Sequence, residues 1–166
     1  MQKRVVTFLI VTTMVFYALC PVSQAQDKPV QLALFSPVQI FPPSTPITGV
    51  RLNLIYGRNV SMSGLDVGLI NHIGDQRSVG AQFGLVGINE GDYVGWQSNW
   101  ININKGDFEG FQYGFVNSSN HASGLQLGFV NYARTLNGLQ IGLVNVIKQG
   151  GQFPVFPIVN WSFESP

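Results

Sequence analysis

Two histidines, His72 and His121, are the side chains of this sequence best suited to metal binding or proton transfer. A metal site needs several converging ligands, and motifs for such sites space them closely. No such spacing joins the two histidines, and both fall between predicted strands. We interpret them as solvated turn residues and predict no catalytic residue, no metal site and no cofactor. An enzyme would have to place its chemistry on loops 72–79 or 117–123.

Acidic side chains recur beside glycines, at Glu90, Asp92, Asp107 and Glu109. Calcium-binding β-repeats carry a strict Gly-Gly-x-Gly-x-Asp signature, which is absent here. Because Gly and Asp tolerate the backbone of tight turns, we expect these acids to serve turn geometry. No Gly-x-Ser-x-Gly nucleophile elbow occurs either.

An eight-residue frame, Gly-Φ-Gln-Φ-Gly-Φ-Val-Asn with Φ apolar, repeats along the chain, and such a period indicates a repeat architecture. Its copies start 15, 16, 15, 15, 14 and 14 residues apart between residues 49 and 138. Clear copies occupy residues 64–71, 80–87, 95–102, 110–117, 124–131 and 138–145, with looser ones at 29–36, 49–56 and 153–160. The residues that define the frame are Gly64, Asn71, Gln82, Gln97, Gln112, Asn117, Gln126, Asn131, Gln140 and Asn145.

Apolar residues alternate with small polar ones inside each copy, and this period of two predicts a strand. In the clear copies, positions 2, 4 and 6 are apolar except at Ser98, and positions 1, 3 and 5 carry Gly, Gln and Gly except at Asp66 and Asn99. Copy 95–102 is therefore either locally irregular or a contact point. Asp66 lies one copy after Arg51, and we predict a structural ion pair between them across neighbouring strands.

About nine short strands and no helix are predicted after residue 25, so we expect a single all-β repeat domain over residues 26–166. We favour a stacked, two-sheet β-solenoid in which two copies form a coil of about 28–31 residues and the two apolar faces meet. The Gln and Asn residues would then form columns whose amides bond up and down the stack. A coil made of one copy ranks last, because the second half of each copy is too polar for an inward-facing wall.

A closed up-and-down β-barrel is the alternative fold, and a small outer-membrane channel is the corresponding function. However, positions 2, 4 and 6 span an apolar band of roughly 15 Å, short of the ~25 Å that such a barrel needs. Proline on a terminal strand blocks further pairing, which an open stack requires. Prolines lie near both ends of the predicted domain, at Pro37, Pro42, Pro43, Pro154 and Pro157.

Aromatic residues cluster in two adjacent copies, at strand positions 2, 4 and 6. We expect them to fill the core; as outward residues they would instead form a sizeable binding patch. The members of this cluster are Trp96, Trp100, Phe111, Tyr113 and Phe115. Tyr93 and Trp161 fall outside the frame and are our candidates for exposed contact.

Residues 1–25 have the layout of a secretory signal peptide. Lys3 and Arg4 precede a largely apolar run of about 15 residues, shorter than the ~20 of a spanning helix, and 23–25 (Ser-Gln-Ala) suit a cleavage site. Cys20, the only cysteine, would leave with this segment. Seven of the nine basic residues then remain against eight acidic ones, a formal net charge of −1, which disfavours nucleic acid as a partner.

The copies at 64–71, 124–131 and 138–145 resemble the leptospiral surface-repeat family, a group of bacterial exported proteins. The stretches 50–57 (VRLNLIYG) and 154–160 (PVFPIVN) also resemble flanks found in such proteins, so the resemblance covers most of residues 29–163. It implies a cell-surface, outer-membrane or periplasmic location and no activity. We therefore expect a non-catalytic envelope protein with a structural or adhesive role and an unknown surface or envelope partner.

Overall fold

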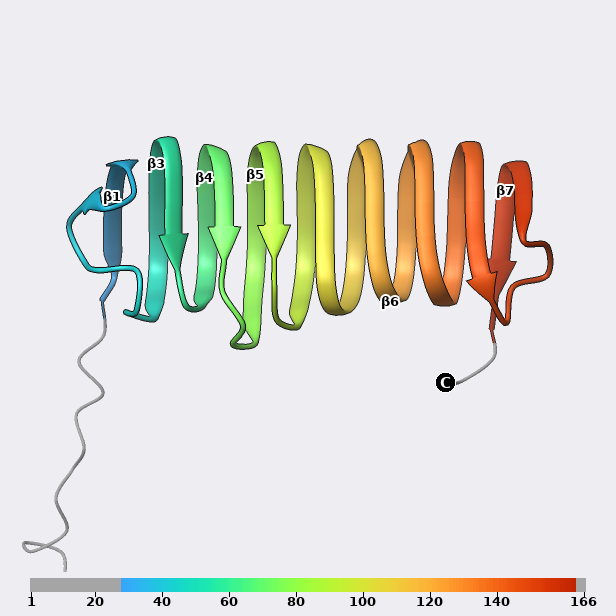
Figure 1. Cartoon of the computed structure of the whole chain (residues 1–166), viewed down its shortest axis with the longest axis horizontal. Coiled ribbons are helices and arrows are strands. Elements are labelled where there is room, and N and C mark those ends of the chain that lie inside the picture. Colours follow the sequence, from blue (N-terminus) through green and yellow to red (C-terminus); the bar gives the residue numbers. More distant parts are fainter. Residues whose placement is uncertain (1–27, 164–166) are drawn as a thin grey trace, which may run out of the picture.

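A single continuous β-sheet winds into a solenoid in the computed structural model, which describes residues 28–163 (Figure 1). The described residues contain no helix, so the predicted all-β solenoid is confirmed. The signal peptide predicted over residues 1–25 lies outside the described residues. The strands are β1 (Val30–Phe35), β2 (Val38–Gln39), β3 (Ile47–Asn59), β4 (Met62–Ile73), β5 (Ser78–Asn89), β6 (Tyr93–Gln149) and β7 (Val155–Ser162).

Each copy of the frame forms one complete coil, so the predicted coil of two copies is wrong. Strands β3, β4, β5 and β6 pair in parallel, and residue 49 lies opposite 64, 64 opposite 80 and 80 opposite 95. Neighbours in an up-and-down barrel run antiparallel, so this register also excludes the barrel. The chain stays extended between the copies, which gives a few long strands in one sheet rather than nine short strands in two.

The polar face of the strands points into the solenoid and the apolar face points out, the reverse of the predicted core. The Gln residues at position 3 and the Asn residues at position 8 are 0–1% exposed wherever they occur in the clear copies. Alternation shows that the two faces differ, but it does not say which is buried. Buried amides are tolerable only when they are hydrogen-bonded, and the solenoid meets this condition by stacking like on like.

The buried Gln side chains form a ladder along the solenoid axis with one direction. Each Nε2 donates to the Oε1 of the Gln one coil earlier, at 2.6–3.1 Å. The ladder runs through Gln140, Gln126, Gln112, Gln97 and Gln82. A ladder of this kind ends, on its N-terminal side, in an Nε2 that has no further Gln to which it can donate.

Asp66 is the acceptor at this end, since its Oδ2 receives Gln82 Nε2 at 3.0 Å. The carboxylate is fully buried, and Arg51 neutralises it with two hydrogen bonds of 2.8 and 2.7 Å. Both side chains are 0–1% exposed, and Arg51 also donates to Asn59 Oδ1 and to the His72 carbonyl. The predicted ion pair is confirmed, and its position at the head of the ladder explains why charge interrupts the Gln column there.

Asn side chains at position 8 form a second ladder, which runs in the opposite direction. Asn102, Asn117 and Asn131 each donate from Nδ2 to the Asn Oδ1 of the following coil at 2.8 Å. Each Nδ2 also reaches a position-4 carbonyl of that coil, at 2.9–3.1 Å. Position 6 lies at a sharp corner where pairing between strands is interrupted, so these amides satisfy backbone oxygens that the sheet leaves free.

Asn99, the residue that departs from the frame, replaces an Asn that the preceding coil lacks. Position 8 of that coil is Gly87, and a Cβ there would overlap the Asn99 side chain. Asn99 Nδ2 donates to Asn102 Oδ1 at 2.7 Å and to Gln82 Oε1 at 3.2 Å. Copy 95–102 is therefore regular inside, and Asn99, at 2% exposure, is not a contact point.

Apolar side chains fill the other half of the interior, beside the ladders. The stacked rings of Tyr93 and Phe108 are 6.3 Å apart, and burial raises the pKa of the Tyr93 hydroxyl far above its usual value. Tyr93 is 2% exposed, so its prediction as a surface contact is wrong. The other members of this cluster are Ile47, Met62, Ile73, Ala122, Ala133, Leu136 and Ile147.

The backbone conformation at position 1 explains why every clear copy has glycine there. Gly110 has φ 134°, a conformation that L side chains rarely adopt, and a Cβ on it would overlap the carbonyl oxygen of Gly95. The position-1 glycines from Gly49 to Gly138 share this geometry. Glycine is therefore required here for close approach of successive coils.

Antiparallel strands end the stack on both sides. β2 pairs with β1, and β7, which contains Pro157, pairs with the last part of β6. Reversed strands and prolines at the two ends discourage other chains from adding to the sheet.

Two Gln residues should be able to replace the Arg51–Asp66 pair, because they would continue the Gln ladder through these two coils. Arg51→Gln or Asp66→Asn alone leaves a buried group unpaired and should lower the free energy of unfolding by about 3–5 kcal/mol. The double variant Arg51→Gln/Asp66→Gln extends the Gln ladder and should lie within about 1 kcal/mol of the parent, or be more stable. Urea unfolding followed by circular dichroism measures this; a double variant as unstable as the single ones would contradict the account.

Moving one Asn by one coil should restore the regular Asn ladder. Asn99→Gly leaves Asn102 Oδ1 short of a donor and should cost about 1–3 kcal/mol. Gly87→Asn alone should also destabilise, since its Cβ would overlap Gln82 Oε1, an acceptor that Asn99 helps to hold in place, and Asn99 Nδ2. Gly87→Asn/Asn99→Gly should recover most of both losses, as measured in the same unfolding assay. Simple addition of the two losses would disprove the exchange.

Candidate functional site

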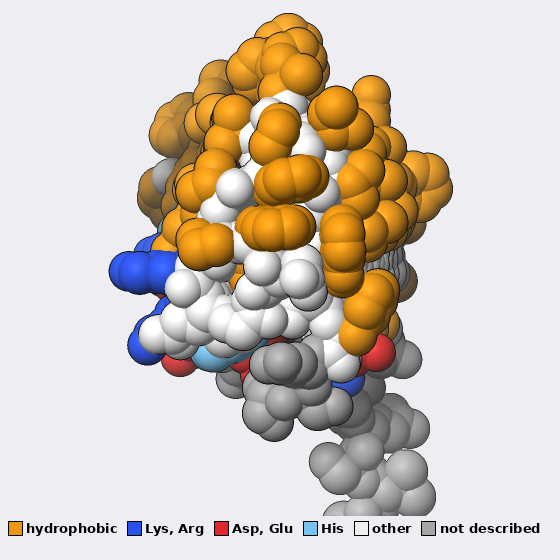
Figure 2. Space-filling view, turned by 90° about the vertical axis from the view of Figure 1, so that its right-hand side faces the viewer, with side chains coloured by type: hydrophobic (Ala, Val, Ile, Leu, Met, Phe, Trp, Pro, Cys, Tyr) orange, Lys and Arg blue, Asp and Glu red, His pale blue; other side chains and the backbone are white. Residues whose placement is uncertain are grey.

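An apolar flank covers much of the outside of the solenoid. It consists of the outward side chains at positions 2, 4, 6 and 7 of successive coils, with position 6 at the corner. In the space-filling view from the C-terminal end, hydrophobic side chains cover the top and spread down both sides (Figure 2). Between residues 50 and 144 none of these positions holds a charged residue. The corner residues, here called the tip column, are Leu54, Leu69, Leu85, Trp100, Phe115, Phe129 and Leu143.

The tip column is the most exposed part of the flank. Leu54 is 65% exposed, Trp100 70% and Leu143 61%. The exposed aromatics include Trp96, Trp100, Tyr113, Phe115 and Phe129, at 48–70%. Since an aromatic side chain has roughly 150–250 Å² of surface, these five alone expose on the order of 500 Å². The largest apolar patch on a typical soluble monomer is only about 300–600 Å² in total, so the complete flank is well outside that range.

The aromatic cluster predicted as core therefore lies mostly on the outside. Trp96, Trp100, Tyr113 and Phe115 are exposed, and Phe111 is half-buried. Neighbouring rings contact one another along the axis, as Phe115 and Phe129 do with centroids 4.5 Å apart. The alternative interpretation as an outward patch is the correct one.

Two shallow grooves run along the flank beside the tip column. The larger, about 780 Å³, lies between the position-4 and position-6 side chains over the backbone of Gly114 and Gly128, and Ile158 of β7 lines it too. The smaller, about 660 Å³, follows the same rows at the N-terminal end, where Val38 of β2 and Ile40 just after it border the groove. Their walls are almost entirely apolar, so they can take hydrocarbon but offer few directional polar contacts.

The frame-defining residues do not form this surface. The Gln and Asn members among them are buried in the two ladders, and Gly64 is a close-approach glycine. Trp161, our other candidate for exposed contact, is 37% exposed and packs edge-on against Phe153, with centroids 6.4 Å apart. Sequence reasoning missed that the variable apolar positions face outward. The near-invariance of Gln and Asn among the copies could have indicated this, because positions in a packed interior vary least.

Charged side chains gather on the side of the coils opposite the tip column, between position 8 of one copy and position 1 of the next. This surface is here called the charged arc. Glu90 is the centre of one cluster: its carboxylate lies 3.2 Å from Lys105 Nζ and 3.4 Å from Arg58 Nη2. His72 Nε2 lies 3.4 Å from the same carboxylate, while its Nδ1 is 2.7 Å from the Tyr56 hydroxyl. Burial lowers the pKa of His72 below 6.5 despite the attraction of Glu90. These contacts link side chains of successive coils.

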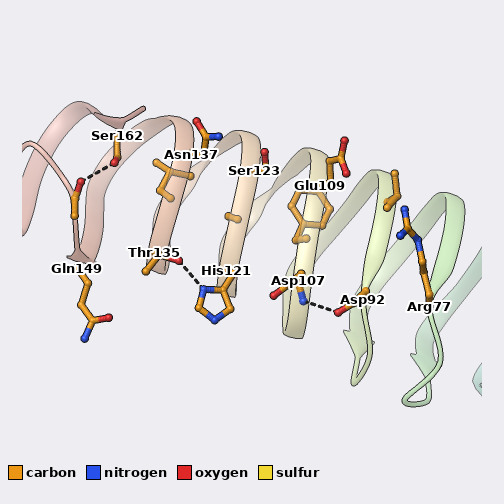
Figure 3. Close-up of a pocket in the computed structure, with 15 residues that line it drawn as sticks. Arg77, Asp92, Asp107, Glu109, His121, Ser123, Thr135, Asn137, Gln149 and Ser162 are labelled. Atoms are coloured by element: carbon orange, nitrogen blue, oxygen red, sulfur yellow. Dashed lines mark hydrogen bonds between the residues drawn. The ribbon is translucent and has the colours of Figure 1, made fainter. Parts of the chain in front are cut away.

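His121 lies in a groove of about 510 Å³ on the charged arc (Figure 3). Its Nδ1 is 2.6 Å from Thr135 Oγ1, and no acid contacts it among the described residues. Asp92 and Asp107 line the same groove, but Asp92 Oδ1 accepts the backbone N–H of Asp107 at 3.0 Å. This arrangement lacks a nucleophile–base–acid series. Within residues 28–163, no group of three or more His, Cys, Asp or Glu side chains could hold a metal ion.

No helix within residues 28–163 is long and apolar enough to cross a membrane. Comparison of the chain with family models, curated proteins and solved structures finds no match. The apolar flank is thus identified as the candidate site by its physical character alone.

The lowered pKa of His72 should make the fold less stable in mild acid. Because the unfolded chain binds a proton near pH 6.5 and folded His72 binds it only at lower pH, its contribution is complete above 6.5 and is lost as pH falls below it. In an NMR titration of the histidine rings, the signal missing from the His72→Gln variant should have its midpoint below 6.5. A midpoint at or above that value would contradict the burial argument.

Proposed function

We propose that this chain is a non-catalytic envelope protein with a structural or adhesive role, and that it acts through its apolar flank. The observation that carries this proposal is the outward apolar face repeated over every coil from residue 49 to 145. Burying such a surface against a partner is strongly favourable, at roughly 25 cal/mol per Å². A solenoid presents the same surface over its full length, which suits a scaffold or an extended contact.

Export supports a role in the envelope. The proposal takes residues 1–25 as a signal peptide and the mature chain as starting at Gln26. Membership of the leptospiral surface-repeat family is proposed on the same sequence grounds. At the cell surface or the outer membrane, a component of the envelope would then be the partner of the flank.

The contacts of the two histidines join neighbouring coils, which supports a non-catalytic role. His72 is held between Tyr56 and Glu90, and His121 contacts Thr135. The most strongly organised polar groups in the described residues are instead the interior ladders, which substrate cannot reach because their side chains are 0–1% exposed.

Charges placed on the tip column should release the protein from the envelope. We compare a flank variant, Trp100→Asp/Leu143→Asp, with an arc variant, Gln76→Asp/Gln149→Asp, which adds the same charge at exposed positions of the opposite arc. All four side chains are exposed, so melting temperatures should change little. Cells expressing the full chain are fractionated and their membranes washed with carbonate. Parent and arc variant should stay with the envelope and the flank variant should be released.

If the flank variant stays in the washed membranes as fully as the parent does, the proposed role of the flank is wrong. Substrate turnover that a single polar substitution abolishes would sink the non-catalytic assignment.

A further inference from the structure

We propose that the occupant of the apolar flank is the hydrocarbon of a lipid bilayer, which the solenoid enters sideways, tip column first, to the depth of one leaflet. Its axis would lie parallel to the membrane plane and its charged arc would remain in water. This contact rests on the proposed function, since both use the same flank, and it names the partner.

The shape of the flank favours lipid over a second copy of the chain. The flank is convex, because apolar side chains continue from the tip column down both sides: positions 2 and 4 on one side and position 7 on the other. Leu65 and Ile101 on these two sides are 38% and 39% exposed, against 70% for Trp100 at the tip. Two convex ridges touch only along a line, whereas fluid acyl chains cover a ridge completely.

Backbone hydrogen bonding permits this immersion. In hydrocarbon every N–H and C=O group needs an internal partner, which normally restricts proteins to helices and closed sheets. Here successive coils pair with each other along the axis, so the side of the solenoid has no free sheet edge. At the corner, where pairing is interrupted, Asn117 Nδ2 binds the carbonyl of Leu127 at 3.1 Å and Asn131 Nδ2 that of Ile141 at 2.9 Å.

The depth of the flank matches one leaflet. Position 2 lies four residue steps from the tip, about 13 Å along the backbone at about 3.3 Å per residue, and the tip side chain brings the apolar band to roughly 15 Å. Half of the hydrocarbon core of a bilayer is about 15 Å thick. The band is therefore too short to cross a membrane and long enough to enter one side of it.

The distribution of charge fits the same orientation. Four exposed cations, Arg58, Lys105, Arg134 and Lys148, follow position 8 of their copies by two or three residues, on the charged arc. In this pose they lie toward the headgroups, where long basic side chains can reach phosphate. Figure 2 shows the basic side chains at the side of the molecule, below the hydrophobic cover.

Flotation with vesicles tests the lipid contact directly. The protein, purified as processed in the envelope of an expressing bacterium, is mixed with vesicles of phosphatidylethanolamine and a minor share of phosphatidylglycerol. Parent and arc variant should float with the vesicles at low salt and equally at about 1 M NaCl, where the Debye length is only about 3 Å. The flank variant should bind at least about tenfold more weakly, because an aspartate in hydrocarbon is strongly disfavoured.

Tryptophan fluorescence provides a second readout that leaves the fold and the binding intact. Lipids brominated near the ends of their acyl chains should quench the fluorescence of the parent protein. Trp100→Phe, which keeps an apolar side chain at the tip, should still float but lose most of that quenching, because Trp96 at position 2 lies about 13 Å shallower. Unchanged quenching in Trp100→Phe would overturn the tip-first orientation.

The other outcomes separate this inference from the function on which it rests. If the parent fails to float, or floats only at low salt, lipid hydrocarbon is not the occupant. If the flank variant is nevertheless released from the envelope of cells, the flank keeps its role and binds a protein instead. If the flank variant both floats and remains in the envelope, both proposals fall.

Discussion

Every coil of this solenoid buries amide groups in a narrow interior, and most of these amides bond to the same kind of side chain one coil away. The Gln ladder and the Asn ladder meet this condition with spacings of 14–16 residues and hydrogen bonds near 3 Å. Because members of a ladder bond to the coils before and after them, their partners have to recur from one coil to the next. A lost member must be compensated nearby, as Asn99 compensates for Gly87. Coil length, register and the close-approach glycines all follow from keeping the amides aligned.

The directions of the ladders account for the irregular members of the stack. Gln donors all point toward the N-terminus, so that end requires an acceptor, and Asp66 serves as one without needing a donor of its own. The carboxylate in turn requires Arg51. At the opposite end Gln140 Oε1 receives no hydrogen bond from the described residues, as expected for the last acceptor of such a ladder. The buried charge pair is thus a consequence of the direction in which the Gln ladder donates its hydrogen bonds.

Sequence reasoning predicted the repeat, its frame, the all-β solenoid and the Arg51–Asp66 pair, since all of these depend on spacing. It failed where the result depends on which face is buried. Apolar alternation is normally assigned to the core because burying hydrocarbon is favourable, and that preference misplaced Trp96, Trp100 and Tyr113. It also put Tyr93, which lies outside the frame, on the surface, although Tyr93 stacks on Phe108 inside. Hydrogen bonds between residues 14–16 positions apart decide the matter. The repeat predicted these amide columns, but the apolar preference placed them on the outer face.

Variation among the copies distinguishes positions fixed by packing from positions that packing leaves free. Interior positions hardly vary, because a Gln must meet a Gln and an Asn must meet an Asn in the next coil. Outward positions vary freely among Leu, Val, Trp and Phe, since a column of exposed side chains imposes no such matching. They nevertheless stay uncharged over the whole length, which the packing of the solenoid does not require. A property kept where packing does not demand it supports the proposed contact of this uncharged convex ridge with an apolar medium.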